Sequence, residues 1–460
     1  MRDKVRRFLS DAEAFYLGRF YPLLIAFIVL FPSLFGFEVF FYFLHATLAS
    51  VGLFISKSIK PFIISLLTFH LEISIKHSPF YPSYSDYLTS GGNLALMIIL
   101  FVTVLGAIFY FAVKKEVIKR AKEEKDRVTL ALAPLSLVLL FNGAFSGEWE
   151  IRGLLFALAL IFTYAILFII IRYGLDYDEG IFEYISYIGV IVSAVMIIQL
   201  LLLFLSGTPI KNGSIVKESV ALGWGIWNLV GGALVSYIPI LFYATRYPRL
   251  KWISLPLCAL AYLSCILTLS RNALLVGTLV LLLCVFIHMR TLVKRRGLVA
   301  LAIAIGFLFL SVAIALAWDK ISTLFLDYFN RLLSDNGRFS LWREAISDFF
   351  RAPIFGVGFY GYTPDTATFG ALPKMAHNFV LEFLCASGIF APIAFGFWIF
   401  ESARAIFKVG DSGRLILSLT PLSVLVGSLL DNFVFYIYPM FIYNVILAII
   451  TKNAKKEKTL

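Results

Sequence analysis

Residues 183–206 read EYISYIGVIVSAVMIIQLLLLFLS, an almost unbroken apolar stretch whose only charged residue, Glu183, stands at its start. An apolar run of about 20 residues is long enough to cross the ~30 Å hydrocarbon core of a bilayer as a helix. The rest of the chain has the same character, because 60% of its 460 residues are hydrophobic and 15% are charged. A soluble domain carries far more charge, so the chain is predicted to be an integral membrane protein.

Comparable apolar runs recur along nearly the whole chain. They cover residues 17–35, 38–56, 61–75, 93–113, 128–146, 152–171, 221–244, 252–269, 273–288, 297–318, 378–401, 415–430 and 433–451. The run at 61–75 is short and contains His70 and Glu72, so it is either a crossing or a re-entrant or interfacial segment. We therefore predict an all-α polytopic membrane protein with about 12–14 transmembrane helices, forming a single domain over residues 1–460.

Basic residues predict the orientation of the chain. Short loops rich in Lys and Arg stay on the cytoplasmic side, and placing the N-terminus inside makes nearly every second loop basic. These segments are 2–7, 57–60, 114–127, 246–251, 290–296, 404–414 and the tail at 452–460. Both termini are thus predicted to be cytoplasmic. The net charge of +12 then reflects topology and contact with anionic membrane lipids, and not nucleic-acid binding.

One long polar segment, residues 319–376, falls on the external side in this topology. Within it Phe339, Trp342, Ile346, Phe349 and Phe350 repeat at helical spacing, which predicts an amphipathic helix that ends before Pro353. Such a helix can lie against the membrane surface or contact a substrate.

Two external arginines stand at predicted helix starts. Arg338 follows Asn336-Gly337, where its guanidinium and the free backbone N–H groups of a first helical turn can bind an anion. Arg271 lies in a short polar interruption between two apolar spans. It is either a snorkelling anchor or a ligand for lipid phosphate.

His377 begins a predicted helix in AHNFVLE, residues 376–382. An ionisable group at the mouth of a membrane helix is costly unless it has a function, and imidazole is the side chain most often used as a general base. The other histidines have ordinary structural explanations; they are His45, His70, His77 and His288.

Two other patterns are predicted to be structural. GVGFYG at 356–361 has dinucleotide-type glycine spacing but follows Pro353 outside any βαβ unit, so it is expected to shape a turn. Asp176-Tyr177-Asp178 imitates a metal-binding acidic pair, but it lies in a short inner loop and is expected to be solvated. The four cysteines show no metal-ligand spacing, so neither a metal nor a cofactor is predicted.

The order of these pieces resembles the O-antigen ligase and polymerase superfamily. The pieces are Ser270-Arg271, GRFSLW at 337–342, PIFGVG at 353–358 and His377-Asn378 followed by Gly388. They cover roughly the second half of the chain. Members of this family transfer a glycan from an undecaprenyl diphosphate carrier to an acceptor sugar, at the periplasmic side of the bacterial inner membrane.

The resemblance implies roles for individual residues. Arg271 and Arg338 would hold the diphosphate, and His377 would activate the acceptor hydroxyl without a metal. The supporting candidates are Asn378, Trp342, Arg343, Glu382 and Asp431. Glu382 is included because many members have an acidic residue at the position of Ala386, about one turn away on nearly the same helical face.

Three functions remain open from the sequence. The first is a ligase that joins a glycan to lipid A core or a similar glycolipid, and the second is a polymerase that extends a carrier-linked glycan. The third is a transporter or flippase. Carriers usually show internal repeats and ionisable groups near the bilayer midplane, whereas the informative polar residues here collect on one external face. The ligase is the leading hypothesis, and no oligomeric state is predicted.

Overall fold

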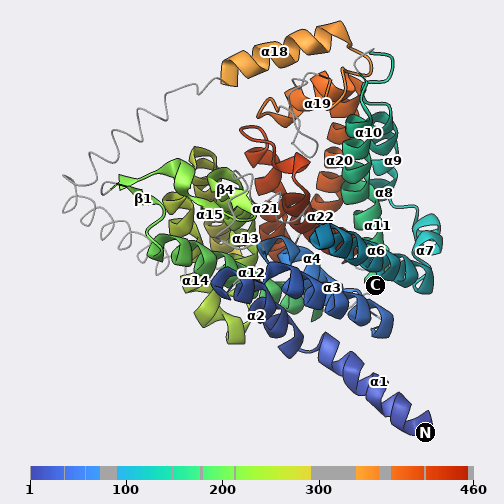
Figure 1. Ribbon diagram of the computed structural model, residues 1–460, viewed down its shortest axis with the longest axis vertical. Coiled ribbons are helices and arrows are strands. Elements are labelled where there is room, and N and C mark those ends of the chain that lie inside the picture. The colour runs from blue at the N-terminus through green and yellow to red at the C-terminus, as the bar shows by residue number, and fades with distance from the viewer. Residues whose placement is uncertain are drawn as a thin grey trace.

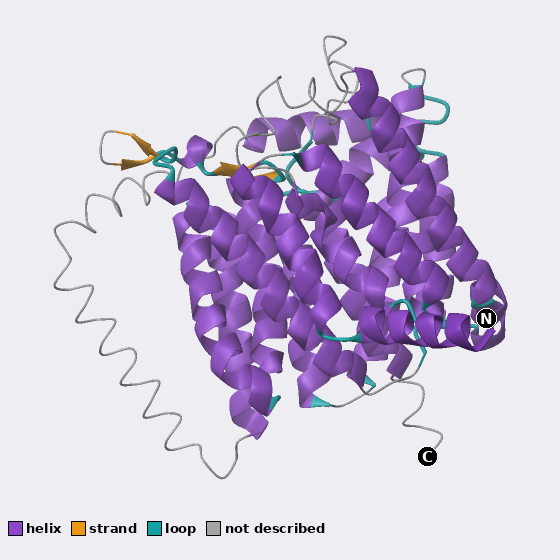
Figure 2. Ribbon diagram, turned by 60° about the horizontal axis from the view of Figure 1, so that its bottom comes forward, coloured by secondary structure: helices purple, strands orange, loops and turns teal. Residues whose placement is uncertain are grey.

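The computed structural model describes residues 2–35, 37–56, 58–72, 91–146, 149–176, 180–211, 214–291, 338–361, 375–408 and 411–453. This part of the chain is a helical bundle, and Figures 1 and 2 show its helices packed side by side. The predicted all-α class is therefore confirmed.

The helices alternate with short turns along the sequence. They are α1 (Arg2–Leu17), α2 (Phe20–Phe35), α3 (Glu38–Ile55), α4 (Lys60–Thr68), α6 (Gly91–Lys114), α7 (Val117–Glu124), α8 (Arg127–Leu130), α9 (Leu132–Leu140), α10 (Ile151–Ile161), α11 (Leu167–Gly174), α12 (Gly180–Leu205), α13 (Trp227–Ala244), α14 (Pro248–Leu267), α15 (Arg271–Thr291), α18 (Arg338–Arg351), α19 (Phe379–Ser387), α20 (Phe390–Phe407), α21 (Ser412–Gly427) and α22 (Ile437–Asn453). A π-helical turn, η2 (Phe162–Ile166), joins α10 to α11, and the 3₁₀ turns are η1 (Phe69–Glu72), η3 (Lys217–Ser219) and η5 (Phe433–Phe435).

The described strands are very short. β1 (Ile210–Lys211) pairs with β2 (Ser214–Ile215), and β3 (Ala221–Leu222) pairs with β4 (Gly225–Ile226), both antiparallel. Both hairpins lie between α12 and α13.

Eight helices in the described ranges are long and apolar enough to cross a membrane, and the bent pair α1 and α2 makes nine if it counts as one span. Shorter apolar helices occur at Arg127–Leu140, Ser412–Gly427 and Ile437–Lys452. The predicted span at 297–318 lies outside the described residues, so the total of about 12–14 stays a prediction. Residues 319–337, 362–374 and 454–460 of the predicted loop and tail also lie outside them.

Three predicted spans have different limits in the structure. The run at 378–401 is interrupted, because α19 ends at Ser387 and α20 begins only at Phe390. Gly388 stands at this break with φ 73 and ψ −172, a backbone conformation that essentially only glycine adopts. Residues 221–226 form the β3–β4 hairpin and not the start of a span, and the helix predicted at 128–146 ends at Leu140.

α13 lies at the centre of one half of the bundle, packed against α12, α14, α15 and α21. In its spanning window, 83% of the residues are buried. The Thr420 hydroxyl on α21 donates to the Ser236 carbonyl on α13 at 2.9 Å, and the Ser270 hydroxyl donates to Asn228 Oδ1 at 2.9 Å. Such polar contacts hold helices together where surrounding lipid offers no hydrophobic gain. The segment before α15 and the helix α21 are thereby both fixed against α13.

Candidate active site

Three helix ends converge at one end of the bundle, where α18 and α19 lie, away from the N-terminus (Figure 1). The Phe379 amide at the start of α19 donates to the Ser428 carbonyl at 3.0 Å. Asn272 at the start of α15 donates from Nδ2 to the Gly427 carbonyl at 2.8 Å. The C-terminal end of a helix leaves carbonyls without partners in that helix. Here the carbonyls at the end of α21 join two segments that are distant in sequence.

His377 and Asp431 form a pair at this convergence. His377 Nδ1 lies 3.2 Å from Asp431 Oδ1, and the histidine side chain is 39% exposed whereas that of the aspartate is 4% exposed. The Asn432 amide donates to the same oxygen at 2.9 Å and so fixes the carboxylate. A carboxylate on Nδ1 holds the proton on that nitrogen and leaves Nε2 able to accept another.

The backbone at His377 is held in an unusual conformation. Its φ of 53 lies in the left-handed region, which is strained for a residue with a side chain. Asn378 follows as the N-cap of α19, and its Oδ1 accepts from the Val380 and Leu381 amides at 3.0 and 3.2 Å. Its Nδ2 donates to the Leu429 carbonyl at 3.1 Å. Asn378 therefore fixes both the start of α19 and the bend that carries His377.

Both polar backbone groups of Ala376, the residue before His377, are also held. Trp342 Nε1 on α18 donates to the Ala376 carbonyl at 2.9 Å, and Glu382 Oε2 on α19 accepts from the Ala376 amide at 2.8 Å. Glu382 is fully buried, and Ala345 of α18 packs in the same apolar cluster as Ala376. Hydrogen bonds with α18 and α19 therefore fix the backbone next to His377, the candidate base.

The two predicted phosphate ligands stand on the border of this network. Arg271 is the first residue of α15 and precedes Asn272, which is bonded to the end of α21. Arg338 is the first residue of α18, four residues before Trp342. It therefore lies on the same face as Trp342, about 6 Å along the axis from the contact with Ala376.

The structure joins most of the predicted site residues. Its hydrogen bonds connect His377 with Asp431 and Asn378 with the turn that follows α21, and they connect both Trp342 and Glu382 with Ala376. Arg343 is exposed on α18. The apolar residues of α18 divide between two sides. Trp342 and Ala345 face α19, while Phe339, Ile346 and Phe350 are exposed.

Residues 353–361 form turns that pack against α19. The Val357 amide donates to the Cys385 carbonyl at 2.8 Å. A Cβ at Gly388 would lie 2.1 Å from the Ile354 carbonyl oxygen, so a side chain does not fit there. The helix α18, and not a strand, precedes this segment. The prediction that the glycine pattern shapes a turn is confirmed, and its role is close backbone packing beside the site.

The sequence prediction for His45 did not include its partner. His45 forms a buried pair with Glu72. His45 Nδ1 on α3 is hydrogen-bonded to Glu72 Oε1 in η1, and both side chains are fully buried. The ring of His70 stacks on that of Tyr438 with centroids 4.5 Å apart. The signal for the pair was present in the sequence, because an ionisable residue in an apolar span needs a partner.

Asp176 belongs to an ion-pair cluster. Lys115 Nζ lies 2.6 Å and Arg120 Nη1 lies 3.0 Å from its carboxylate oxygens. Burial by itself would raise the pKa of Asp176, but the hydrogen bonds from Lys115 and Arg120 lower it below its ordinary value. Asp178 lies outside the described residues. Within the described ranges, no group of three His, Cys, Asp or Glu side chains is placed to hold a metal ion.

The fold and this arrangement define a multi-pass helical membrane protein with a histidine–carboxylate pair at one end of its bundle. A family model described as O-antigen ligase matches residues 256–396, which run from α14 to α20 and include Arg271, Arg338 and His377. The resemblance to the O-antigen ligase and polymerase superfamily is thereby confirmed over this segment, and it supports an O-antigen ligase-like type of activity. No curated protein matches the chain.

Proposed function

We propose that this protein transfers a glycan from an undecaprenyl diphosphate carrier to a sugar hydroxyl of lipid A core or a similar glycolipid, at the periplasmic face of the inner membrane. The observation that carries the proposal is the contact of His377 Nδ1 with Asp431 at 3.2 Å. The carboxylate is buried and the imidazole is partly exposed. Nε2 is then directed to act as a general base on a bound acceptor.

The transfer is a direct displacement. The acceptor oxygen attacks the anomeric carbon while His377 Nε2 takes its proton, and the bond from that carbon to the diphosphate breaks. The configuration at the anomeric carbon is therefore inverted. Asp431 stabilises the imidazolium that forms, as a carboxylate does behind other catalytic histidines.

Arg271 and Arg338 act on the leaving group. Negative charge grows on the diphosphate as its bond to the sugar breaks, so fixed guanidinium groups bind the transition state more strongly than the donor. Both arginines begin helices, where free backbone N–H groups add to the attraction for an anion. Because the donor sugar is already activated by the diphosphate, the reaction needs a base and charge stabilisation but no nucleotide.

The test uses purified protein with an undecaprenyl diphosphate oligosaccharide, with and without a lipid A core acceptor, and mass spectrometry of the lipid products. Wild type is expected to form the transfer product only when the lipid A core acceptor is present. His377→Ala is expected to form no product. Asp431→Asn should retain donor binding and lose turnover on the order of 10²-fold or more. His288→Ala, at the other end of α15, is the control and should transfer normally.

Other outcomes would assign a different function. Lengthening of the glycan on its carrier without the core would establish the polymerase. Equal transfer by wild type and His377→Ala would rule out the histidine as the base. If wild type forms neither product, transport of the carrier-linked glycan becomes the function to test.

A further inference from the structure

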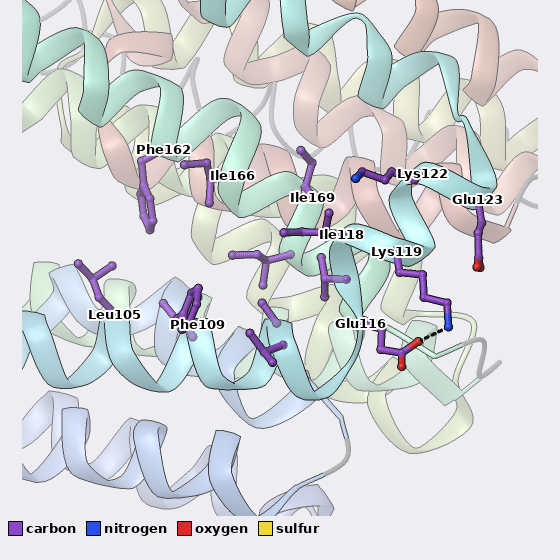
Figure 3. A pocket seen from close by; sticks show the side chains of 15 residues that line it. Leu105, Phe109, Glu116, Ile118, Lys119, Lys122, Glu123, Phe162, Ile166 and Ile169 are labelled. Atoms are coloured by element: carbon purple, nitrogen blue, oxygen red, sulfur yellow. Dashed lines mark hydrogen bonds and ion pairs between the residues drawn. The ribbon is translucent and has the colours of Figure 1, made fainter.

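An apolar groove lies between α6 and the continuous helix formed by α10, η2 and α11 (Figure 3). Its cavity volume is about 970 Å³, and an adjoining cavity of about 280 Å³ shares Leu105, Ile108 and Phe162 with it. The two cavities together follow α6 from Met97 to Val113. That length of helix is about 24 Å, which covers most of the thickness of the hydrocarbon core.

The groove is open because α6 packs mainly against α3 and touches α11 only sparsely. Only 22% of the spanning window of α6 is buried. On the opposite wall, Asn444 Nδ2 on α22 donates to the Thr163 carbonyl at 2.5 Å, within the π turn. A π turn widens a helix locally and is frequent at functional sites. Phe162 and Ile166 of this turn line the groove.

The helix α7, which carries both basic and acidic side chains, closes one end of the groove. It contributes Ile118, which is 68% exposed, together with Lys119, Lys122 and Glu123. Lys119 is paired with Glu116 at 2.9 Å. Figure 3 shows the side chains of Lys122 and Glu123 leaving α7 in different directions. Within the described ranges, Lys122 is exposed and has no hydrogen bond or ion pair.

We propose that this groove binds one anionic phospholipid, with an acyl chain between α6 and η2 and its phosphate against Lys122. Walls this apolar, opening to the membrane, favour hydrocarbon over water. An ammonium group near the surface, with its stem along apolar side chains, attracts an anionic lipid head. A zwitterionic lipid can fill the same walls but carries no net charge for Lys122 to attract. This site is separate from the His377 site and does not depend on the proposed transfer reaction.

The test titrates the full-length protein, delipidated in detergent, with phosphatidylglycerol or phosphatidylcholine and counts bound lipids by native mass spectrometry. Phosphatidylglycerol is expected to bind more tightly. Lys122→Gln should weaken it about fivefold, the effect of one basic residue near a lipid head, and leave phosphatidylcholine unchanged. Lys251→Gln removes an exposed lysine outside the groove and should change neither affinity.

A second pair of variants tests the apolar part of the groove. Ile166→Trp fills it and is expected to weaken both lipids. Leu279→Trp on α15, at 42% exposure against 45% for Ile166, is the matched control and should weaken neither. Equal binding of the two lipids by wild type, or unchanged phosphatidylglycerol binding in Lys122→Gln, would overturn the headgroup site. Unchanged binding in Ile166→Trp would show that the lipid sits elsewhere.

Discussion

At the scale of single residues, Glu382 explains how a strained histidine is kept in place. Its carboxylate accepts from the Ala376 amide at 2.8 Å while buried, so it supports the backbone next to His377. Glu382→Gln keeps an acceptor oxygen and should retain most transfer activity and thermal stability. Glu382→Leu leaves a buried amide without a partner, which costs about 1–3 kcal/mol, and should reduce both.

The two Glu382 variants also show whether Glu382 acts by positioning the backbone or through its negative charge. Activity and melting temperature are measured together for Glu382→Gln, Glu382→Leu and Trp342→Phe, which removes the indole N–H bond to Ala376 and keeps an aromatic ring. Trp342→Phe is expected to lower kcat up to about tenfold, the range of a single hydrogen bond. A Glu382→Gln protein that is stable but as inactive as His377→Ala would show that Glu382 acts through its charge.

At the scale of elements, the break between α19 and α20 holds the site segment together. Gly388 adopts φ 73 with the Ile354 carbonyl oxygen 2.1 Å from where a Cβ would lie. Gly388→Ala must therefore part residues 353–358 from α19 and should destabilise the protein on the order of 3 kcal/mol. Gly396→Ala is the control, because a Cβ there meets nothing within 4 Å and alanine favours the helix. Similar melting temperatures for the two variants would contradict the role of this contact.

At the scale of the whole molecule, the predicted orientation places α18 outside and the segment after α20 inside. The native cysteines are all buried, so a single introduced thiol can be labelled selectively. We expect a membrane-impermeant maleimide to label Ser340→Cys on intact spheroplasts, and Lys408→Cys only after permeabilisation. Both positions are exposed in the structure, so a difference reports the side of the membrane. The reverse pattern would place the His377 site in the cytoplasm and contradict periplasmic transfer.

The sequence by itself determined the membrane class and most of the helices, and it predicted Arg271, Arg338 and His377 as site residues. The hydropathy of a span depends only on the residues within that segment. A charged residue that interrupts such a span can therefore be recognised without knowing which residues are near it in space. Asp431 was expected only as a supporting residue, and its contact with His377 spans 54 positions of the chain.

Only the tertiary structure decided which groups meet. Three features depend on how helices distant in sequence are packed. They are the hydrogen bonds of Trp342 and Glu382 with the Ala376 backbone, the His45–Glu72 pair and the groove along α6. The break at Gly388 depends on the approach of the Ile354 carbonyl. Local apolar patterns specify that a segment is a helix. The hydrogen bonds at helix ends select its partners, because carbonyl and amide groups there must find partners outside their own helix.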